Sequence, residues 1–173
     1  MRETVIISAV RTPVGKCRGG LASVPAHVLG GAVVKEAVRR AGIEPAEVDE
    51  VLFGNLMANE YANIARVVAL EAGLPYSVPA MTLDRQCASS LSAFSMAAAM
   101  IASGQADVLV AGGVESDSRR CYVMEKPTQA YQNQPPQWAE IRNAPKPEAA
   151  ISMVMTAENL AEKYGISRQE CDG

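Results

Sequence analysis

The chain has 173 residues, 49% of them apolar and 20% charged, which is the composition of a folded globular protein with a core of its own. Its formal net charge is −3, aromatic residues total 5%, and no block of basic residues occurs, so nucleic acid is not an expected partner. No apolar run reaches the length of a membrane span, and the first residues indicate a strand rather than a signal peptide, so no membrane partner is expected.

The first third of the chain predicts a strand, a loop and a helix. Residues 3–10 form a short β-rich run with a continuous apolar core, which is typical of a strand buried on both faces. Residues 11–25 contain several glycines and prolines and predict a loop. A helix is expected from Pro25 to a C-cap at Gly42, with charged residues on one face. Its other face is apolar and comprises Leu29, Val33, Val34, Ala37, Val38 and Ala41.

Strands and helices alternate through the middle of the chain. Further strands are expected at 51–53, 78–83 and 107–111, with helices at 62–72 and 89–103. This alternation predicts an α/β fold with a mostly parallel sheet and helices on both faces. The helix at 89–103 has almost no polar face, so we expect it to be buried on all sides.

Cys87 is the candidate nucleophile. It lies between the strand at 78–83 and the helix at 89–103, in the position of a helix N-terminus. Unpaired backbone N–H groups and the positive end of the helix dipole stabilise a thiolate there, and a thiolate can attack an acyl group. The alternative is a buried cysteine that acts as a small apolar residue.

The other cysteines and the single histidine suggest no metal site. Cys17, Cys121 and Cys171 are far apart in sequence and form no C-x-x-C pair, so neither zinc nor a disulfide framework is expected, and a reducing cytoplasm is the default location. Cys17 and Cys121 fall in predicted loops. His27 is expected to be a surface or helix-entry residue.

Several motifs occur in the order and spacing of the thiolases. The chain carries Ala-Gly-Leu-Pro at 72–75, Arg-Gln-Cys-Ala-Ser at 85–89 and Ala-Gly-Gly-Val-Glu-Ser at 111–116. Ser-Ala-Val-Arg-Thr-Pro at 8–13 is similar to their first strand and loop. From about residue 4 to its end, the chain therefore resembles the acetyl-CoA acetyltransferases and 3-ketoacyl-CoA thiolases.

The resemblance implies a fold and a domain organisation. Residues 1–117 would form the N-terminal core, a three-layered thiolase-like half. Residues 118–173 would begin the loop region that covers coenzyme A and end in a helix. The stretch 118–150 has five prolines and no glycine, which is typical of a long irregular loop; a solvated surface loop is the alternative to a lid.

The resemblance also implies the chemistry. Cys87 would be the acyl-thioester nucleophile, with its backbone N–H as an oxyanion donor, and Ala88, Ser89 and Ser90 would contact the substrate. A Claisen condensation with a second acyl-CoA, or its thiolytic reverse, would follow. Coenzyme A enters as part of the substrate, and no metal or redox cofactor is implied. The Arg-Gln-Cys variant is closer to degradative enzymes of fatty acid metabolism.

Two expected catalytic motifs are missing. Thiolases carry a histidine in a Gly-His-Pro motif and a second cysteine in a Cys-x-Gly motif, and this chain has neither. We therefore expect an incomplete chain that is inactive in the full reaction. Three positions also depart from the family pattern: Ser90 replaces a usual glycine, Asp84 a usual asparagine and Asp117 a usual methionine.

The resemblance also predicts how the chain assembles. Family members dimerise through the strand before the nucleophile, here about 81–83, so a homodimer or larger assembly is expected.

One alternative function is that of a related ketoacyl-synthase-like condensing enzyme, although the segments at 72–75 and 114–116 favour a thiolase. The other is a non-catalytic assembly fragment in which Cys87 is packed away.

Overall fold

The computed structural model describes residues 2–57, 60–127, 129, 131, 135–139 and 142–173. The chain forms two compact units, 1–121 and 122–173, and each is described by itself. The elements of the first unit, in chain order, are α1 (Ala26–Ala41), the 3-10 turn η1 (Pro45–Glu47), β1 (Glu50–Gly54), α2 (Ile64–Glu71), β2 (Ala80–Leu83), α3 (Ser89–Ser103), β3 (Leu109–Gly113) and the 3-10 turn η2 (Asp117–Arg119).

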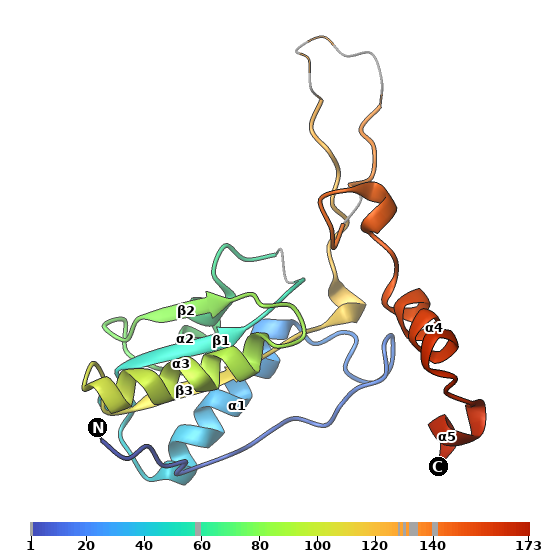
Figure 1. The fold of residues 1–173 in the computed structure, drawn as a ribbon. Coiled ribbons are helices and arrows are strands. Elements are labelled where there is room, and N and C mark those ends of the chain that lie inside the picture. Colours follow the sequence, from blue (N-terminus) through green and yellow to red (C-terminus); the bar gives the residue numbers. More distant parts are fainter. Residues whose placement is uncertain (1, 58–59, 128, 130, 132–134, 140–141) are drawn as a thin grey trace. The chain divides into compact units, whose positions relative to one another are not determined.

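A parallel three-stranded sheet in the order β2-β1-β3 forms the centre of the first unit. Because side chains alternate along a strand, Val51 and Phe53 of β1 face one side and Leu52 faces the other. Val51 and Phe53 belong to a core shared with α1 and α2, and Leu52 packs against α3. The helices therefore cover both faces of the sheet, which confirms the predicted α/β architecture (Figure 1).

The helix α1 forms as its sequence pattern predicts. Gly42 ends it in the left-handed conformation, with φ at 69°, and its N–H donates to the carbonyl of Arg39. On the solvent side, the guanidinium groups of Arg39 and Arg40 each bond the carboxylate of Glu36 at 2.7 Å. These hydrogen bonds lower the pKa of Glu36 to about 2.

The strand predicted at residues 3–10 does not form, so this expectation was wrong. The segment lies along the β3 side of the sheet but pairs with no strand in the described structure, and Val5, Ile6 and Ile7 are exposed. A strand requires a neighbour about 4.8 Å away, and here a cavity separates the segment from β3. The apolar residues of this segment favour burial, but burial as a strand requires a paired neighbouring strand.

The expectation that α3 is buried on all sides was also wrong. Its buried residues are Ser89, Ala93 and Ala97, which are four residues apart and form one stripe against the sheet. Leu91 is 69% exposed and Phe94 is 47% exposed. The helix rests on the sheet by its smallest side chains, and within the described residues its apolar outer face has no covering element.

The described residues of the second unit that precede Met153 are largely irregular, as the prolines predict. It contains an isolated antiparallel bridge between Met124 and Trp138 and a 3-10 turn, η3 (Pro147–Ala149). Two helices follow, α4 (Met153–Tyr164) and α5 (Arg168–Asp172), each with a serine at its N-cap. The helix expected at the end of the region 118–173 is thus present.

Candidate active site

The turn between β2 and α3 is held in a strained conformation by two side chains. Gln86 has φ at 51°, in the left-handed region that L-residues rarely adopt. Its N–H donates to Oδ1 of Asp84 at 2.8 Å. The hydroxyl of Ser89 accepts from the N–H of Arg85 at 2.9 Å and donates to the carbonyl of Gln86 at 2.5 Å. Short polar side chains that bond nearby backbone groups stabilise such turns.

Cys87 follows the strained residue directly and is exposed with a free thiol. The next residue, Ala88, is the N-cap of α3, and the helix proper begins at Ser89. The predicted position of Cys87 at a helix N-terminus is therefore the observed one. The same order of strand, strained turn and helix presents the nucleophile in α/β-hydrolases, because it exposes the side chain at the carboxyl edge of the sheet.

Two of the three neighbours predicted to contact substrate, Ala88 and Ser89, have polar groups that bond within the turn. The N–H of Ala88 donates to the carbonyl of Arg85 at 3.2 Å. Ser89 is buried, and its hydroxyl makes the two bonds described above. Ser90 is half-buried and its side chain points toward Gly113. Of the four predicted residues, Cys87 alone is exposed, and substrate contacts by Ala88, Ser89 and Ser90 stay a prediction.

Two glycines let the amino end of α3 lie against the sheet. A Cβ atom added to Gly54 would lie 2.6 Å from the backbone nitrogen of Ser90. A Cβ atom added to Gly113 would lie 2.1 Å from the hydroxyl oxygen of Ser90. The strands predicted at 51–53 and 107–111 stop short of both glycines, although glycine within a strand often marks a close backbone approach.

A second polar cluster, also missed from sequence, lies at the same carboxyl edge. The side-chain amide of Asn55 donates to the carbonyl of Val114 at 2.7 Å. The carboxylate of Glu115 accepts from the N–H groups of Leu56 and Met57 at 2.9 and 3.2 Å. These bonds tie the start of the β1–α2 loop to the segment after β3. The signal that could have revealed this cluster is that polar residues directly follow two strands of the sheet.

The same loop is held further along by His27 and Arg119. The hydroxyl of Tyr61 lies 2.8 Å from Nδ1 of His27, with the two rings edge to face at 5.0 Å. Arg119 approaches the carboxylate of Glu60 at 3.7 Å. His27 lies in the first turn of α1, as expected, and its ring nitrogen bonds within the fold.

Within the described residues, no group of three or more histidine, cysteine, aspartate or glutamate side chains could hold a metal ion. None of the described helices combines the length and the apolarity needed to cross a membrane. All four cysteines are free, and the thiol of Cys17 lies 3.3 Å from a carboxylate oxygen of Asp117.

A family model described as "Thiolase, N-terminal domain" matches residues 4–173. The chain belongs to the thiolase family. It is 41% identical to the beta-ketoadipyl-CoA thiolase of Acinetobacter baylyi and 40% identical to the acetyl-CoA acetyltransferase of Pseudomonas aeruginosa, over 99% of this chain and 45% of each relative. The crystal structure of the Bacillus anthracis acetyl-CoA acetyltransferase has a TM-score of 0.84 and 39% identity, over 95% of this chain and 42% of that one.

This thiolase chain therefore spans less than half the length of the curated relatives it matches. Its departures from the family pattern have a structural reading. Ser90 points at Gly113, and its hydroxyl lies close to the backbone of β3. Asp84 stands where the family usually has asparagine. Its carboxylate Oδ1 accepts the hydrogen bond from Gln86 as an amide Oδ1 would, and it adds a negative charge.

Replacing Asp84 separates these two effects. Asp84→Asn keeps an oxygen that accepts from Gln86, so we expect unchanged stability and, because a negative charge near the thiol is lost, a several-fold faster alkylation of Cys87 near neutral pH. Asp84→Ala loses the acceptor and is expected to cost about 1 kcal/mol in the free energy of unfolding. Urea denaturation and iodoacetamide labelling followed by peptide mass mapping measure both quantities. Equal destabilisation by the two variants would contradict the role given to the oxygen.

Proposed function

We propose that this protein carries out thiolase-type acyl transfer, with Cys87 as the residue that accepts the acyl group. The observation that carries the proposal is the exposed, free thiol on a turn fixed by Asp84 and Ser89, at the amino end of α3. The membership of the chain in the thiolase family supports the same role for the Arg-Gln-Cys-Ala-Ser segment.

The first step forms an acyl-enzyme. The thiolate of Cys87 attacks the carbonyl carbon of an acyl-CoA thioester, so that a new carbon–sulfur bond forms. The bond between that carbon and the coenzyme A sulfur breaks, and coenzyme A leaves as a thiolate. The backbone N–H of Cys87 donates to the carbonyl oxygen as negative charge develops on it. Acyl-CoA is thus the substrate, and we assign no metal or redox cofactor.

The second step needs a general base. This chain does not contain the family motif that would supply one. Condensation requires removal of a proton from the carbon next to the carbonyl of a second acyl-CoA, and the resulting enolate attacks the acyl-enzyme. His27, which bonds Tyr61, lies outside a Gly-His-Pro motif. We therefore expect residues 1–173 alone to accept an acyl group without completing the condensation or its thiolytic reverse.

Intact-protein mass spectrometry after incubation with acetyl-CoA tests the first step. We expect one added acetyl group, lost in Cys87→Ala and retained in Cys17→Ala, which removes another exposed thiol. The thiol of Cys17 lies by a carboxylate rather than at a helix terminus, so it is a matched control. An unmodified but folded protein, or an adduct that survives Cys87→Ala, would overturn the assignment.

One alternative is a fragment that only assembles with a partner. The exposed outer face of α3, with Leu91 and Phe94, favours such contacts. Cys87 is exposed, so the expectation that this alternative packs it away was wrong. Slow iodoacetamide labelling of Cys87 in the folded protein would still favour the alternative, because an exposed thiol that is not activated reacts slowly. A ketoacyl-synthase-like enzyme would instead decarboxylate a malonyl donor, which an incubation with malonyl-CoA tests.

The assembly, location and pathway are also proposals. The outer edge of β2 has no neighbouring strand among the described residues, which suits a homodimer that pairs two copies along Ala80–Leu83. The four widely spaced cysteines suit a reducing cytoplasm. The similarity to acetyl-CoA acetyltransferases suits a role in fatty acid metabolism.

A further inference from the structure

Both ends of the turn that carries Cys87 rest on neighbouring residues at the end of β1. The turn starts after Leu83, the last residue of β2, whose carbonyl accepts from the N–H of Asn55 at 3.1 Å. It ends at Ser89, the first residue of α3. The backbone of Gly54 lies against this serine, because a Cβ atom added to the glycine would lie 2.8 Å from the carbonyl carbon of Ser89. Gly54 and Asn55 therefore support the turn at its entry and at its exit.

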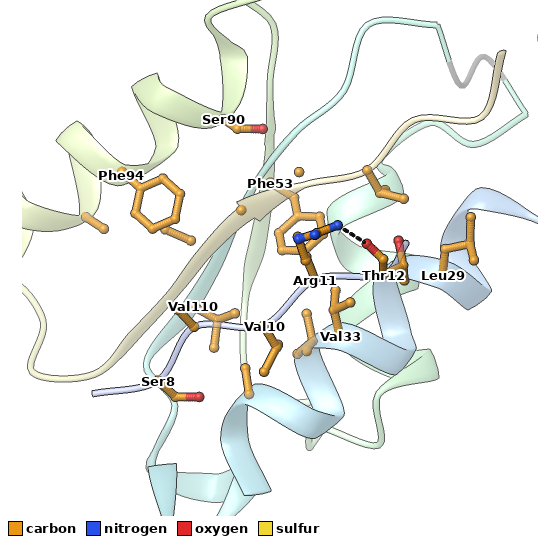
Figure 2. Close-up of a pocket in the computed structure, with 18 of the residues that line it drawn as sticks. Ser8, Val10, Arg11, Thr12, Leu29, Val33, Phe53, Ser90, Phe94 and Val110 are labelled. Carbon is orange, nitrogen blue, oxygen red and sulfur yellow. Dashed lines mark hydrogen bonds between the residues drawn. The ribbon is translucent and has the colours of Figure 1, made fainter. Parts of the chain in front are cut away.

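The next residue of α3, Ser90, contacts the paired ends of β1 and β3. Gly54 and Gly113 are partners in the register of the sheet. The backbone nitrogen of Ser90 lies against Gly54, and its hydroxyl oxygen lies against Gly113. Figure 2 shows Ser90 in the first turn of α3, close to the end of β3. The position of the amino end of α3 therefore depends on how these two strand ends are held together.

Asn55 fastens the two strand ends to each other. Its side-chain amide donates to the carbonyl of Val114 at 2.7 Å, one residue beyond Gly113. In the opposite direction, the N–H of Val114 donates to the carbonyl of Gly54 at 3.1 Å. Asn55 is only 9% exposed, so water competes little with its hydrogen bonds. Because its own N–H bonds Leu83, Asn55 joins the carboxyl ends of all three strands.

The support reaches Cys87 through Ser89. The hydroxyl of Ser89 bonds the N–H of Arg85 and the carbonyl of Gln86. The N–H of Ser89 also donates to the carbonyl of Gln86, at 3.0 Å. A shift of Ser89 is therefore passed to the two residues that precede Cys87. The direction of the Cys87 N–H and the place of its thiol depend in this way on Asn55.

We propose that Asn55 is a positioning residue for Cys87, because its amide and its N–H hold the three strand ends that fix the turn. The consequence for catalysis rests on the proposed acyl transfer. Acylation needs the thiolate and the N–H donor in one fixed geometry, and a misplacement of about 1 Å can slow a reaction about a hundredfold. Asn55 acts through the turn and needs no contact with the substrate.

Two neutral substitutions remove the amide of Asn55. Asn55→Ala truncates the side chain, and Asn55→Leu keeps its branched shape but cannot donate to Val114. The control is Asn63→Ala, which removes another amide that donates to a backbone carbonyl, that of Ala80 at 2.9 Å, at the opposite end of β2. Asn63 is also the N-cap of α2, so this control weakens the fold away from the Cys87 turn.

Amide hydrogen exchange followed by NMR measures how firmly the turn is held, independently of acyl transfer. The N–H of Val38, buried in α1, serves as the reference for the stability of the whole unit. Relative to Val38, we expect exchange at the N–H groups of Arg85 and Ser89 to quicken about tenfold or more in both Asn55 variants, because the hydrogen bonds of the turn open more often. In Asn63→Ala, we expect no such relative change.

Acetylation kinetics test the catalytic consequence. Intact-protein mass spectrometry follows the adduct on Cys87 over time at several acetyl-CoA concentrations, at a temperature where circular dichroism shows each variant folded. We expect the limiting rate constant to fall about tenfold or more in both Asn55 variants, at an unchanged half-saturating concentration of acetyl-CoA. A merely weakened fold, as in Asn63→Ala, would lower the fraction of chains that react and leave the rate constant unchanged.

The two measurements separate the failure of this proposal from the failure of acyl transfer. If the parent protein gains no acetyl group, the proposed function falls, and quickened exchange at Arg85 and Ser89 still assigns the holding of the turn to Asn55. Unchanged exchange in both Asn55 variants would overturn the positioning role. Equal effects of Asn63→Ala would also overturn it, since any loss of stability would then suffice. A rate constant equal to that of the parent would overturn the catalytic consequence.

Discussion

Phe53→Ala is expected to lower the free energy of unfolding by about 3–5 kcal/mol. Phe53 is 2% exposed and lies on the central strand, within the core shared by α1 and α2. Its ring also lies against the backbone of Gly112 on β3, so truncation leaves a void between two strands. Because a single domain has only about 5–15 kcal/mol of stability, this one change is expected to bring the protein close to unfolding.

The chain offers a matched control, since it has only two phenylalanines. Phe94 is 47% exposed on the outer face of α3, so Phe94→Ala is expected to cost about 1 kcal/mol or less. Urea denaturation followed by circular dichroism compares the two variants. Equal losses would mean that the outer face of α3 is as well packed in solution as the core around Phe53.

Gly54→Ala is expected to cost about 1–3 kcal/mol and to disturb the turn that carries Cys87. The added methyl group would lie 2.6 Å from the nitrogen of Ser90 and 2.8 Å from the carbonyl carbon of Ser89. Both are backbone atoms, so a side-chain rotation cannot relieve the clash and the amino end of α3 must shift. Acetylation of Cys87 by acetyl-CoA is therefore expected to fall together with stability.

Gly20→Ala is the control for this substitution. A Cβ atom at Gly20 meets nothing within 4 Å, and its φ lies outside the left-handed region. Its stability and its acetylation are expected to match those of the parent protein. If Gly54→Ala were as stable and as readily acetylated as Gly20→Ala, the amino end of α3 would not be held by the close contact with β1.

Local signals in the sequence predict most of the first unit. The helix α3 begins at Ser89 and ends at Ser103 as expected, because Gly104 can adopt the left-handed cap conformation. The end of α1 at Gly42 has the same cause. The position of Cys87 also follows from local order, since a strand and a helix flank it closely.

The errors concern properties that depend on distant parts of a chain. The apolar run at 3–10 favours burial, but pairing requires a neighbour that the sequence of the run does not specify. The same reason applies to α3, whose outer face is apolar yet uncovered among the described residues. The positive φ of Gln86 could not be predicted, because nothing in a glutamine marks a strained turn.

The loop between β1 and α2 is fastened by three residues from two other segments. Glu115 holds its start, Arg119 approaches Glu60, and His27 binds Tyr61. An engineer who transplanted this loop alone into a relative would leave these partners behind. A chimera that keeps the loop's conformation must therefore exchange the loop together with the amino end of α1 and the segment that follows β3.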